Sequence, residues 1–91
     1  MFNTLNQTVT VNDRCGLHML AAQQIVQLAT RFKSSLTISN ERHRANAKSI
    51  LDLLMLAAIC GSTLDLRASG EDAEMALREV AQIISPETEL K

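Results

Sequence analysis

The sequence has few aromatic residues and almost no net charge. Of its 91 residues only Phe2 and Phe32 are aromatic, and Trp and Tyr do not occur. A core must therefore be built from aliphatic side chains, and the stacking platforms of single-stranded nucleic acid binders are excluded. The formal net charge is -1, so we expect no bulk attraction to nucleic acid or to a membrane surface.

The sequence also lacks long apolar stretches. Its longest apolar run, LLMLAAIC at 53–60, is far shorter than the roughly 20 residues needed to span a bilayer. The segment MFNTLNQTVTV has no basic region followed by an apolar core, so no secretory signal is expected. Cys15 and Cys60 are the two cysteines, and we expect them to be reduced thiols. Together these features predict a cytoplasmic protein.

The length of the chain limits the kinds of function it can perform. With 91 residues it is expected to form one domain, 1–91, without a deep substrate cavity. A carrier or binding module is therefore favoured over a stand-alone enzyme, and no cofactor is expected. Cys15 and His18 form a single C-x-x-H pair without a second pair of ligands, so no metal site is predicted.

Alternation of polar and apolar residues predicts four short strands. In TVTV the side chains of Val9 and Val11 are expected to face inward, as are those of Leu64 and Leu66 in STLDLRAS. The segment NERH at 40–43 is expected to form a hairpin turn. The predicted strands are residues 8–12, 34–40, 43–48 and 62–69.

Apolar residues at helical spacing predict three helices. Ser49 stands three residues before Asp52, as in a capping box, and Ser69 stands three before Asp72. Pro86 is expected to end the last helix, with a flexible tail at 85–91. The predicted helices are residues 18–32, 50–57 and 71–84. The resulting order predicts an α+β open-faced sandwich, in which three helices cover one face of a four-stranded antiparallel sheet.

Three segments carry a family resemblance. GLHMLAAQQIVQLATRF, beginning at Gly16, resembles the active-site segment of HPr, the histidine-containing phosphocarrier of the bacterial phosphoenolpyruvate-dependent sugar phosphotransferase system. That family reads Gly-Leu-His-(Thr/Ala)-Arg-Pro-Ala at this place. NAKSILDLLMLA at 46–57 is similar to its second motif, and SGEDAEMALREV at 69–80 to its last helix. The resemblance covers about residues 7–84 and implies the HPr-like fold.

The resemblance implies a role for His18. The matching histidine accepts a phosphoryl group from the first enzyme of the system and passes it to a sugar-specific or regulatory acceptor. Free amides and the positive dipole end at a helix start suit such an anion, and a neutral imidazole is a competent nucleophile. The residues alone also allow a second interpretation, a polar histidine that only hydrogen-bonds locally.

The residues after His18 depart from the family pattern. The family Arg two residues on and Pro three residues on are replaced by Leu20 and Ala21. Leucine cannot donate the bidentate bonds that arginine makes to phosphoryl oxygens. Arg14 is a candidate for the missing charge, or a solvated loop residue. Gly16 is expected to allow a close backbone approach beside the site.

Ser49 is a second candidate site. In many family members the matching serine is phosphorylated by an ATP-dependent kinase. A serine at a helix start also has a structural role, worth about 1 kcal/mol as an N-cap. A phosphate on Ser49 would face the carboxylate of Asp52, which partly offsets the favourable helix dipole.

The resemblance also implies a docking surface and two possible functions. Ile50, Leu51 and Leu54 are expected to dock partner proteins, with Leu20 extending the patch, while Leu53, Leu56 and Ala57 are expected in the core. The implied partners of a monomeric chain are the first phosphotransferase-system enzyme, an acceptor protein and a serine kinase. The alternative is a regulatory binding module of the same fold that has lost carrier activity, an interpretation favoured by Leu20.

Overall fold

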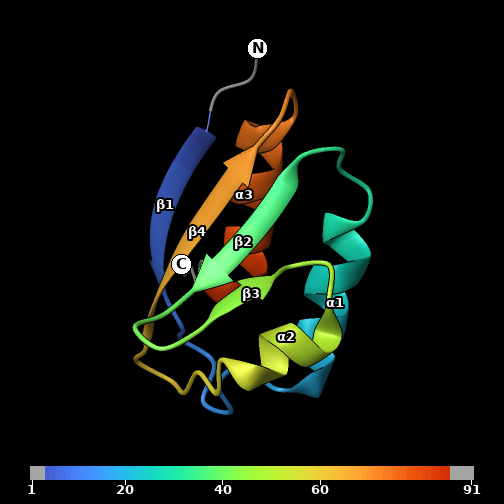
Figure 1. Cartoon of the computed structure of the whole chain (residues 1–91). Helices are drawn as coiled ribbons and strands as arrows, with labels where there is room; N and C mark the ends of the chain where they lie inside the picture. Colours follow the sequence, from blue (N-terminus) through green and yellow to red (C-terminus); the bar gives the residue numbers. More distant parts are fainter. Residues whose placement is uncertain (1–3, 87–91) are drawn as a thin grey trace, which may run out of the picture.

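Four strands and three helices make up the protein (Figure 1). The computed structural model describes residues 4–86. The elements in chain order are β1 (Thr4–Thr10), α1 (Met19–Ala29), β2 (Ser35–Ser39), β3 (Arg44–Asn46), α2 (Ile50–Met55), β4 (Thr63–Ser69) and α3 (Ala73–Ile84). This order and the α+β class are those that the sequence predicts.

The strands form one antiparallel sheet in the order β1-β4-β2-β3. In β4 every second side chain is buried, because Leu64, Leu66 and Ala68 face the helices. Val9 lies opposite Leu64, and Ile38 lies opposite Leu66. The alternation predicted from the sequence therefore sets both the register and the buried face.

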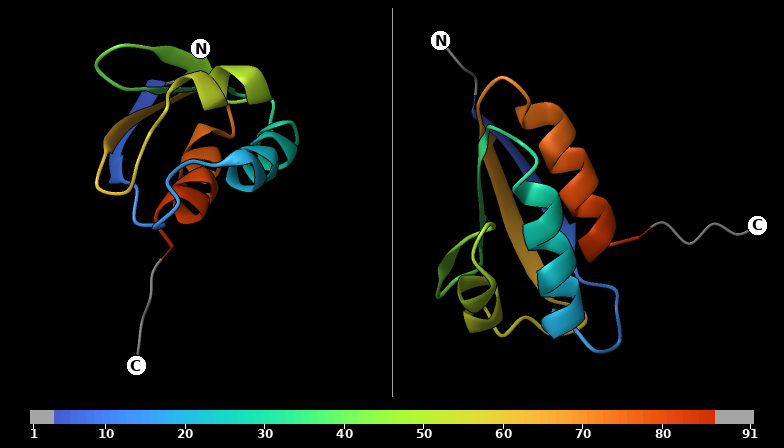
Figure 2. Two further views of the ribbon diagram at one scale, coloured as in Figure 1. Left: turned by 90° about the horizontal axis from the view of Figure 1, so that it is seen from below. Right: turned by 90° about the vertical axis from the view of Figure 1, so that its right-hand side faces the viewer.

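All three helices cover the same face of the sheet, as the two views of Figure 2 show. α1 packs against α3 and α2, and α3 packs against β1 and β4. Ile25, Leu53 and Val80 contribute one fully buried side chain from each helix. Each such side chain stabilises the fold by about 1.5–3 kcal/mol, so aliphatic packing replaces the missing aromatic residues.

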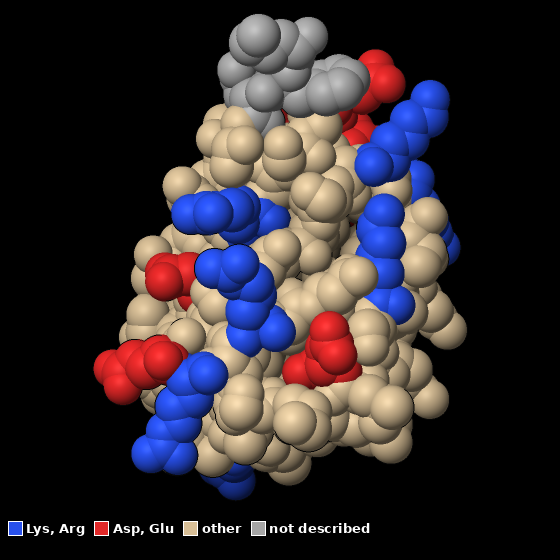
Figure 3. All heavy atoms as spheres, in the orientation of Figure 1, with Lys and Arg blue, Asp and Glu red and all other residues tan. Residues whose placement is uncertain are grey.

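The other face of the sheet is open and polar. Arg44, Asp65 and Arg67 are exposed there, and Thr8 donates a hydrogen bond to Asp65 over 3.1 Å. Figure 3 looks onto this face and shows basic side chains near its middle with acidic ones beside them. Charges of both signs keep this face solvated, so helices are needed on one side of the sheet alone.

The boundaries of several elements differ from those predicted. β1 begins at Thr4 rather than residue 8, because it is an edge strand in which Val9 is the one fully buried residue. α1 is shorter at both ends than 18–32. α2 ends at Met55, and Ala57 has a left-handed φ of 51°. Ala57 is exposed rather than in the core, where it was predicted to be. The predicted tail extends into residues 87–91, which lie outside the described part.

The start of α3 is also built differently. Ser69 is the last residue of β4 and caps no helix, and Asp72 flanks α3 without a side-chain capping bond. The Asp72 carboxylate instead accepts hydrogen bonds from the Ser34 hydroxyl and from the backbone amides of Ser34 and Lys33. Asp72 therefore ties the start of β2 to α3, so the capping-box prediction at Ser69 was wrong. Glu74 lies in the first turn of α3, where its charge suits the helix dipole.

Candidate functional site

His18 is the N-cap residue of α1. Its backbone is extended, at φ −90° and ψ −179°, and its Nδ1 accepts a bond from the Ala21 amide over 3.4 Å. Among residues 4–86 the amides of Met19 and Leu20 have no hydrogen-bond acceptor. Nδ1 therefore sits at the positive end of the helix dipole, beside amides that are free to bind an anion.

Asp13 orients the imidazole ring from the other side. Its Oδ2 lies 3.4 Å from Nε2 of His18, and its Oδ1 accepts the Cys15 amide over 2.8 Å. The Cys15 amide, with a smaller contribution from His18, holds the pKa of Asp13 below its ordinary value. A carboxylate can only accept, so Nε2 carries the ring proton. Nδ1 then holds the free lone pair, as its bond from Ala21 also requires.

The side chain of His18 is about one-third exposed, at 35%. The imidazole can therefore be reached by another protein, while the two contacts fix the ring plane and the tautomer. Asp13 was not predicted as a site residue, because its contact with His18 depends on the turn between residues 13 and 16. In that turn the Gly16 amide donates to the Asp13 carbonyl over 2.9 Å.

Gly16 brings this turn against the loop that follows α2. It has a left-handed φ of +71°, and a Cβ there would lie 2.5 Å from the carbonyl oxygen of Ala58. The next amide, that of Leu17, donates to the same oxygen over 2.9 Å. This close approach is made to the backbone of Ala58, and the support of a phosphoryl group by Gly16 stays a prediction. Gly16 thus fixes the position from which α1 and His18 begin.

Leu20 brings no positive charge to the site, and the support predicted from Arg14 stays a prediction. Leu20 is 58% exposed, so the place of the family arginine lies at the surface and holds an apolar side chain. Arg14 is exposed on the turn, and its side chain makes no hydrogen bond or ion pair to another of residues 4–86. The free backbone amides at the start of α1 are donors that the described residues offer at this site.

An exposed apolar patch adjoins the site. It consists of side chains from the first turn of α1, from α2 and from the following loop, each more than half exposed: Met19, Leu20, Leu51, Met55 and Ile59. Ile50 and Leu54, also expected to dock partners, are half-buried and pack against the core. Leu53 and Leu56 lie in the core as predicted. Met55 was not predicted as part of this patch, although its position four residues after Leu51 places both on one helical face.

Ser49 is the N-cap of α2, as the sequence predicts. Its hydroxyl oxygen accepts the Asp52 amide over 3.3 Å. The Asp52 carboxylate bonds the Asn46 amide over 3.1 Å. Ser49 is half-buried, so its hydroxyl has a structural role and remains partly accessible.

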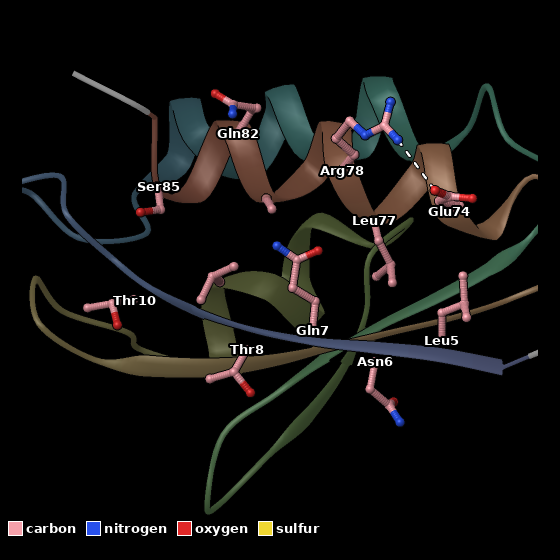
Figure 4. Close-up of a pocket in the computed structure, with 12 residues that line it drawn as sticks. Leu5, Asn6, Gln7, Thr8, Thr10, Glu74, Leu77, Arg78, Gln82 and Ser85 are labelled. Atoms are coloured by element: carbon pink, nitrogen blue, oxygen red, sulfur yellow. Dashed lines mark hydrogen bonds and ion pairs between the residues drawn. The ribbon is translucent and has the colours of Figure 1, made fainter. Parts of the chain in front are cut away.

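The site lies on the surface, away from a groove of about 890 Å³ that runs between β1 and α3 (Figure 4). Gln7 and Leu77 point into it, and Arg78 pairs with Glu74 over 3.5 Å at its edge. It contains neither His18 nor Ser49.

The described residues offer neither a metal-binding cluster nor a membrane-spanning helix. Within residues 4–86 no three His, Cys, Asp or Glu side chains gather in a way that could hold a metal ion. In the same part of the chain no helix combines the length and apolar character needed to cross a membrane.

Comparison with known proteins identifies the family. The model described as the PTS HPr component phosphorylation site matches residues 5–85. The chain belongs to the HPr family. The resemblance seen in the sequence is thereby confirmed for almost the whole described chain, and the fold prediction with it.

Relatives within the HPr family include both named phosphocarriers and a protein named for regulation. Phosphocarrier protein HPr of Neisseria meningitidis serogroup A is 35% identical over 81 residues, which are 89% of this chain and 91% of that protein. The crystal structure of HPr from Bacillus anthracis matches with a TM-score of 0.86 and 33% identity, over 90% of this chain and 98% of that one. Crh, the catabolite repression protein of Bacillus subtilis, matches with a TM-score of 0.74 and 36% identity, over 92% and 97%. Its crystal structure is described as a swapped dimer.

Proposed function

We propose that this HPr-family protein is a phosphoryl carrier and that Nδ1 of His18 is the acceptor atom. The single observation that carries the proposal is the position of Nδ1. It holds the ring lone pair and faces the amides at the start of α1. In the transfer, Nδ1 attacks the phosphorus of the donor, the bond from phosphorus to the donor breaks, and the donor keeps that electron pair. The ring gains positive charge, and the Asp13 carboxylate stabilises it through Nε2.

The onward step uses the same groups. The phosphoryl oxygens on Nδ1 are held by backbone amides and the α1 dipole, each dipole interaction being worth about 0.3–1 kcal/mol at an exposed site. A guanidinium at position 20 would add a charge-assisted contact that Leu20 cannot make. The phosphorylated state is therefore less stabilised than in relatives that have this arginine. It forms more slowly and transfers its group more readily.

The donor is the first enzyme of the phosphotransferase system, and the apolar patch is its docking surface. The patch adjoins His18 and presents only aliphatic and thioether side chains. Leu51→Asp should weaken transfer from that enzyme, because a charge would be buried in the complex. Met75→Asp is the matched control, since Met75 is equally an exposed apolar residue, at 52%, but lies on α3 outside the patch. Equal effects of the two variants would contradict this assignment.

The acceptor is tested by labelling. Phosphoenolpyruvate and the first phosphotransferase enzyme should label His18, and His18→Ala should abolish the label. The label should be acid-labile, as expected of a phosphoramidate, and Asp13→Asn should slow its formation without unfolding the protein. An absence of label on the folded wild-type protein with every donor tried would refute the carrier function.

A second candidate is a regulatory module modified at Ser49. Two observations favour it: the partly accessible hydroxyl of Ser49 at the start of α2, and the similarity to a protein named for catabolite repression. ATP and a serine kinase would then add an acid-stable phosphate ester, which Ser49→Ala would remove. An acid-stable label on Ser49, together with no label on His18, would establish the regulatory module in place of the carrier.

A further inference from the structure

Another hollow lies on the open face of the sheet, on the side that the helices leave uncovered. Its volume is about 360 Å³, near the lower limit of pockets that bind small molecules. Figure 3 looks onto this face, where basic side chains lie near the middle. The hollow does not include His18, and it is lined by polar or charged residues from all four strands: Asn6, Thr37, Ser39, Arg44, Asp65 and Arg67.

The register of the sheet explains why a hollow forms here. Thr37 on β2 lies opposite Arg67 on β4, and Ser39 on β2 lies opposite Arg44 on β3. The two β2 side chains are short and half-buried, whereas the two arginines are long and exposed. Short side chains between longer ones leave a depression, so the hydroxyl groups of Thr37 and Ser39 lie at its floor with an arginine on each side.

The two arginines of the hollow are not neutralised by carboxylates. Nε of Arg67 donates to the side-chain oxygen of Asn6, a neutral acceptor, over 3.1 Å. Among residues 4–86 neither Arg67 nor Arg44 forms an ion pair. Asp65 on the same face is also held by a neutral partner, since Thr8 donates to its carboxylate from β1 over 3.1 Å. Guanidinium N–H groups are therefore available on both sides of the hollow.

We propose that this hollow binds a small polyhydroxylated phosphate monoester. The phosphate dianion lies between Arg44 and Arg67, because two cations match its double charge and the guanidinium fork matches its oxygens. The hydroxyl groups of Thr37 and Ser39 donate to the same anion. Asp65 repels an anion placed beside it, but its carboxylate accepts hydrogen bonds from the hydroxyl groups of the ligand. The hollow thus selects for a molecule that carries both kinds of group.

Glycerol 3-phosphate is the probe, added to the full chain labelled with ¹⁵N and followed through the NMR signals of the backbone amides. The amides of Thr37, Ser39, Arg44 and Arg67 should shift, with a dissociation constant on the order of 1 mM, as expected of an exposed site with two charge-assisted contacts. Inorganic phosphate should bind about fivefold more weakly, because it lacks the bond to Asp65. Glycerol without phosphate should shift none of these signals.

Three results of the titration would overturn the proposal. The first is no shift on the open face at roughly 10 mM glycerol 3-phosphate. The second is a set of shifts confined to the amides at the start of α1. The third is an equal affinity for inorganic phosphate, which would leave the ligand hydroxyl groups without a role.

Substitutions test which side chains hold the probe. Arg44→Gln and Arg67→Gln should each weaken its binding about tenfold. Arg31→Gln is the matched control, because it removes the same charge from an exposed arginine outside the hollow, and it should bind as the wild type does. Equal losses in all three folded variants would mean that net charge alone attracts the anion, and would overturn the site.

Asp65→Asn tests the hydroxyl contact separately. Without the carboxylate, inorganic phosphate is no longer repelled and the probe loses an acceptor, so the fivefold preference for the probe should shrink. An unchanged preference would overturn the role of Asp65. These measurements use no phosphoryl donor, so their outcome does not depend on whether His18 is labelled.

Discussion

Replacing Gly16 by alanine tests whether the turn before His18 depends on a missing side chain. The added Cβ would meet the Ala58 carbonyl oxygen at 2.5 Å, and the backbone would keep a left-handed φ of +71°. Left-handed backbone costs a non-glycine residue about 1–2 kcal/mol. Separating the two segments would also break the bond from Leu17 to Ala58, at about 0.5–1.5 kcal/mol. The separation would also partly expose Leu17, which is buried in the wild type. This exposure adds to the loss in stability.

Gly61→Ala provides a matched control for this prediction. Gly61 also has a positive φ, +93°, but nothing lies within 4 Å of a Cβ built there. Both variants carry the backbone strain, and only Gly16→Ala carries the clash. Gly16→Ala should therefore lose about 2 kcal/mol more stability than Gly61→Ala, a further drop in Tm of roughly 8–16 °C.

Urea unfolding followed by circular dichroism measures the difference, since the chain has no Trp or Tyr for fluorescence. The folded fraction of Gly16→Ala should also be labelled slowly at His18, because its turn is displaced. Equal free energies of unfolding for the two variants would refute the argument. They would mean that the segments can separate without cost and that the close approach does not position the site.

Two other substitutions test separate parts of the molecule. Leu20→Arg should speed labelling of His18 about tenfold or more, because a charge-assisted contact contributes about 1.5–3 kcal/mol; no change in a folded protein would mean that the amides suffice. Asp72→Asn should reduce the loss in free energy of unfolding that the wild type shows at acid pH. The Ser34 hydroxyl, and after it the Lys33 amide, hold the pKa of Asp72 below its ordinary value. The stabilisation is therefore present above that ordinary value, about 3.9, and is lost as the pH falls through the lowered one. If the free energy of unfolding depends on pH across pH 2–6 in the same way for the variant and the wild type, this role is contradicted.

The sequence predicts those parts of the fold that depend on local pattern. The strict alternation in β4 places Leu64, Leu66 and Ala68 in the core, as observed. β1 was predicted too short, since an edge strand above a groove buries little and its first half shows no alternation. Asp72 could not be placed from the sequence either, because its partner Ser34 lies 38 residues away.

The candidate site, too, could be predicted from the sequence only in part. His18 and Ser49 lie at helix starts that short motifs reveal, and both are N-caps in the structure. Asp13 depends on the shape of a turn, and a contact at 3.4 Å across five residues has no sequence signature. The apolar patch depends on which face of α2 is covered by its neighbours. For this reason Met55 was missed, and Leu54 proved more buried than expected.

The order of the strands also governs when the fold can form during synthesis. β4 pairs with both β1 and β2, and it follows all the other strands in the chain. Until Thr63–Ser69 have left the ribosome, the pairing of β2 with β3 is the only part of the sheet that can form. The strand β1 must wait for a partner more than fifty residues downstream, and such non-local pairing is slow. The nascent chain is thus exposed to misassociation until β4 and then α3, which packs against β1 and β4, have been made.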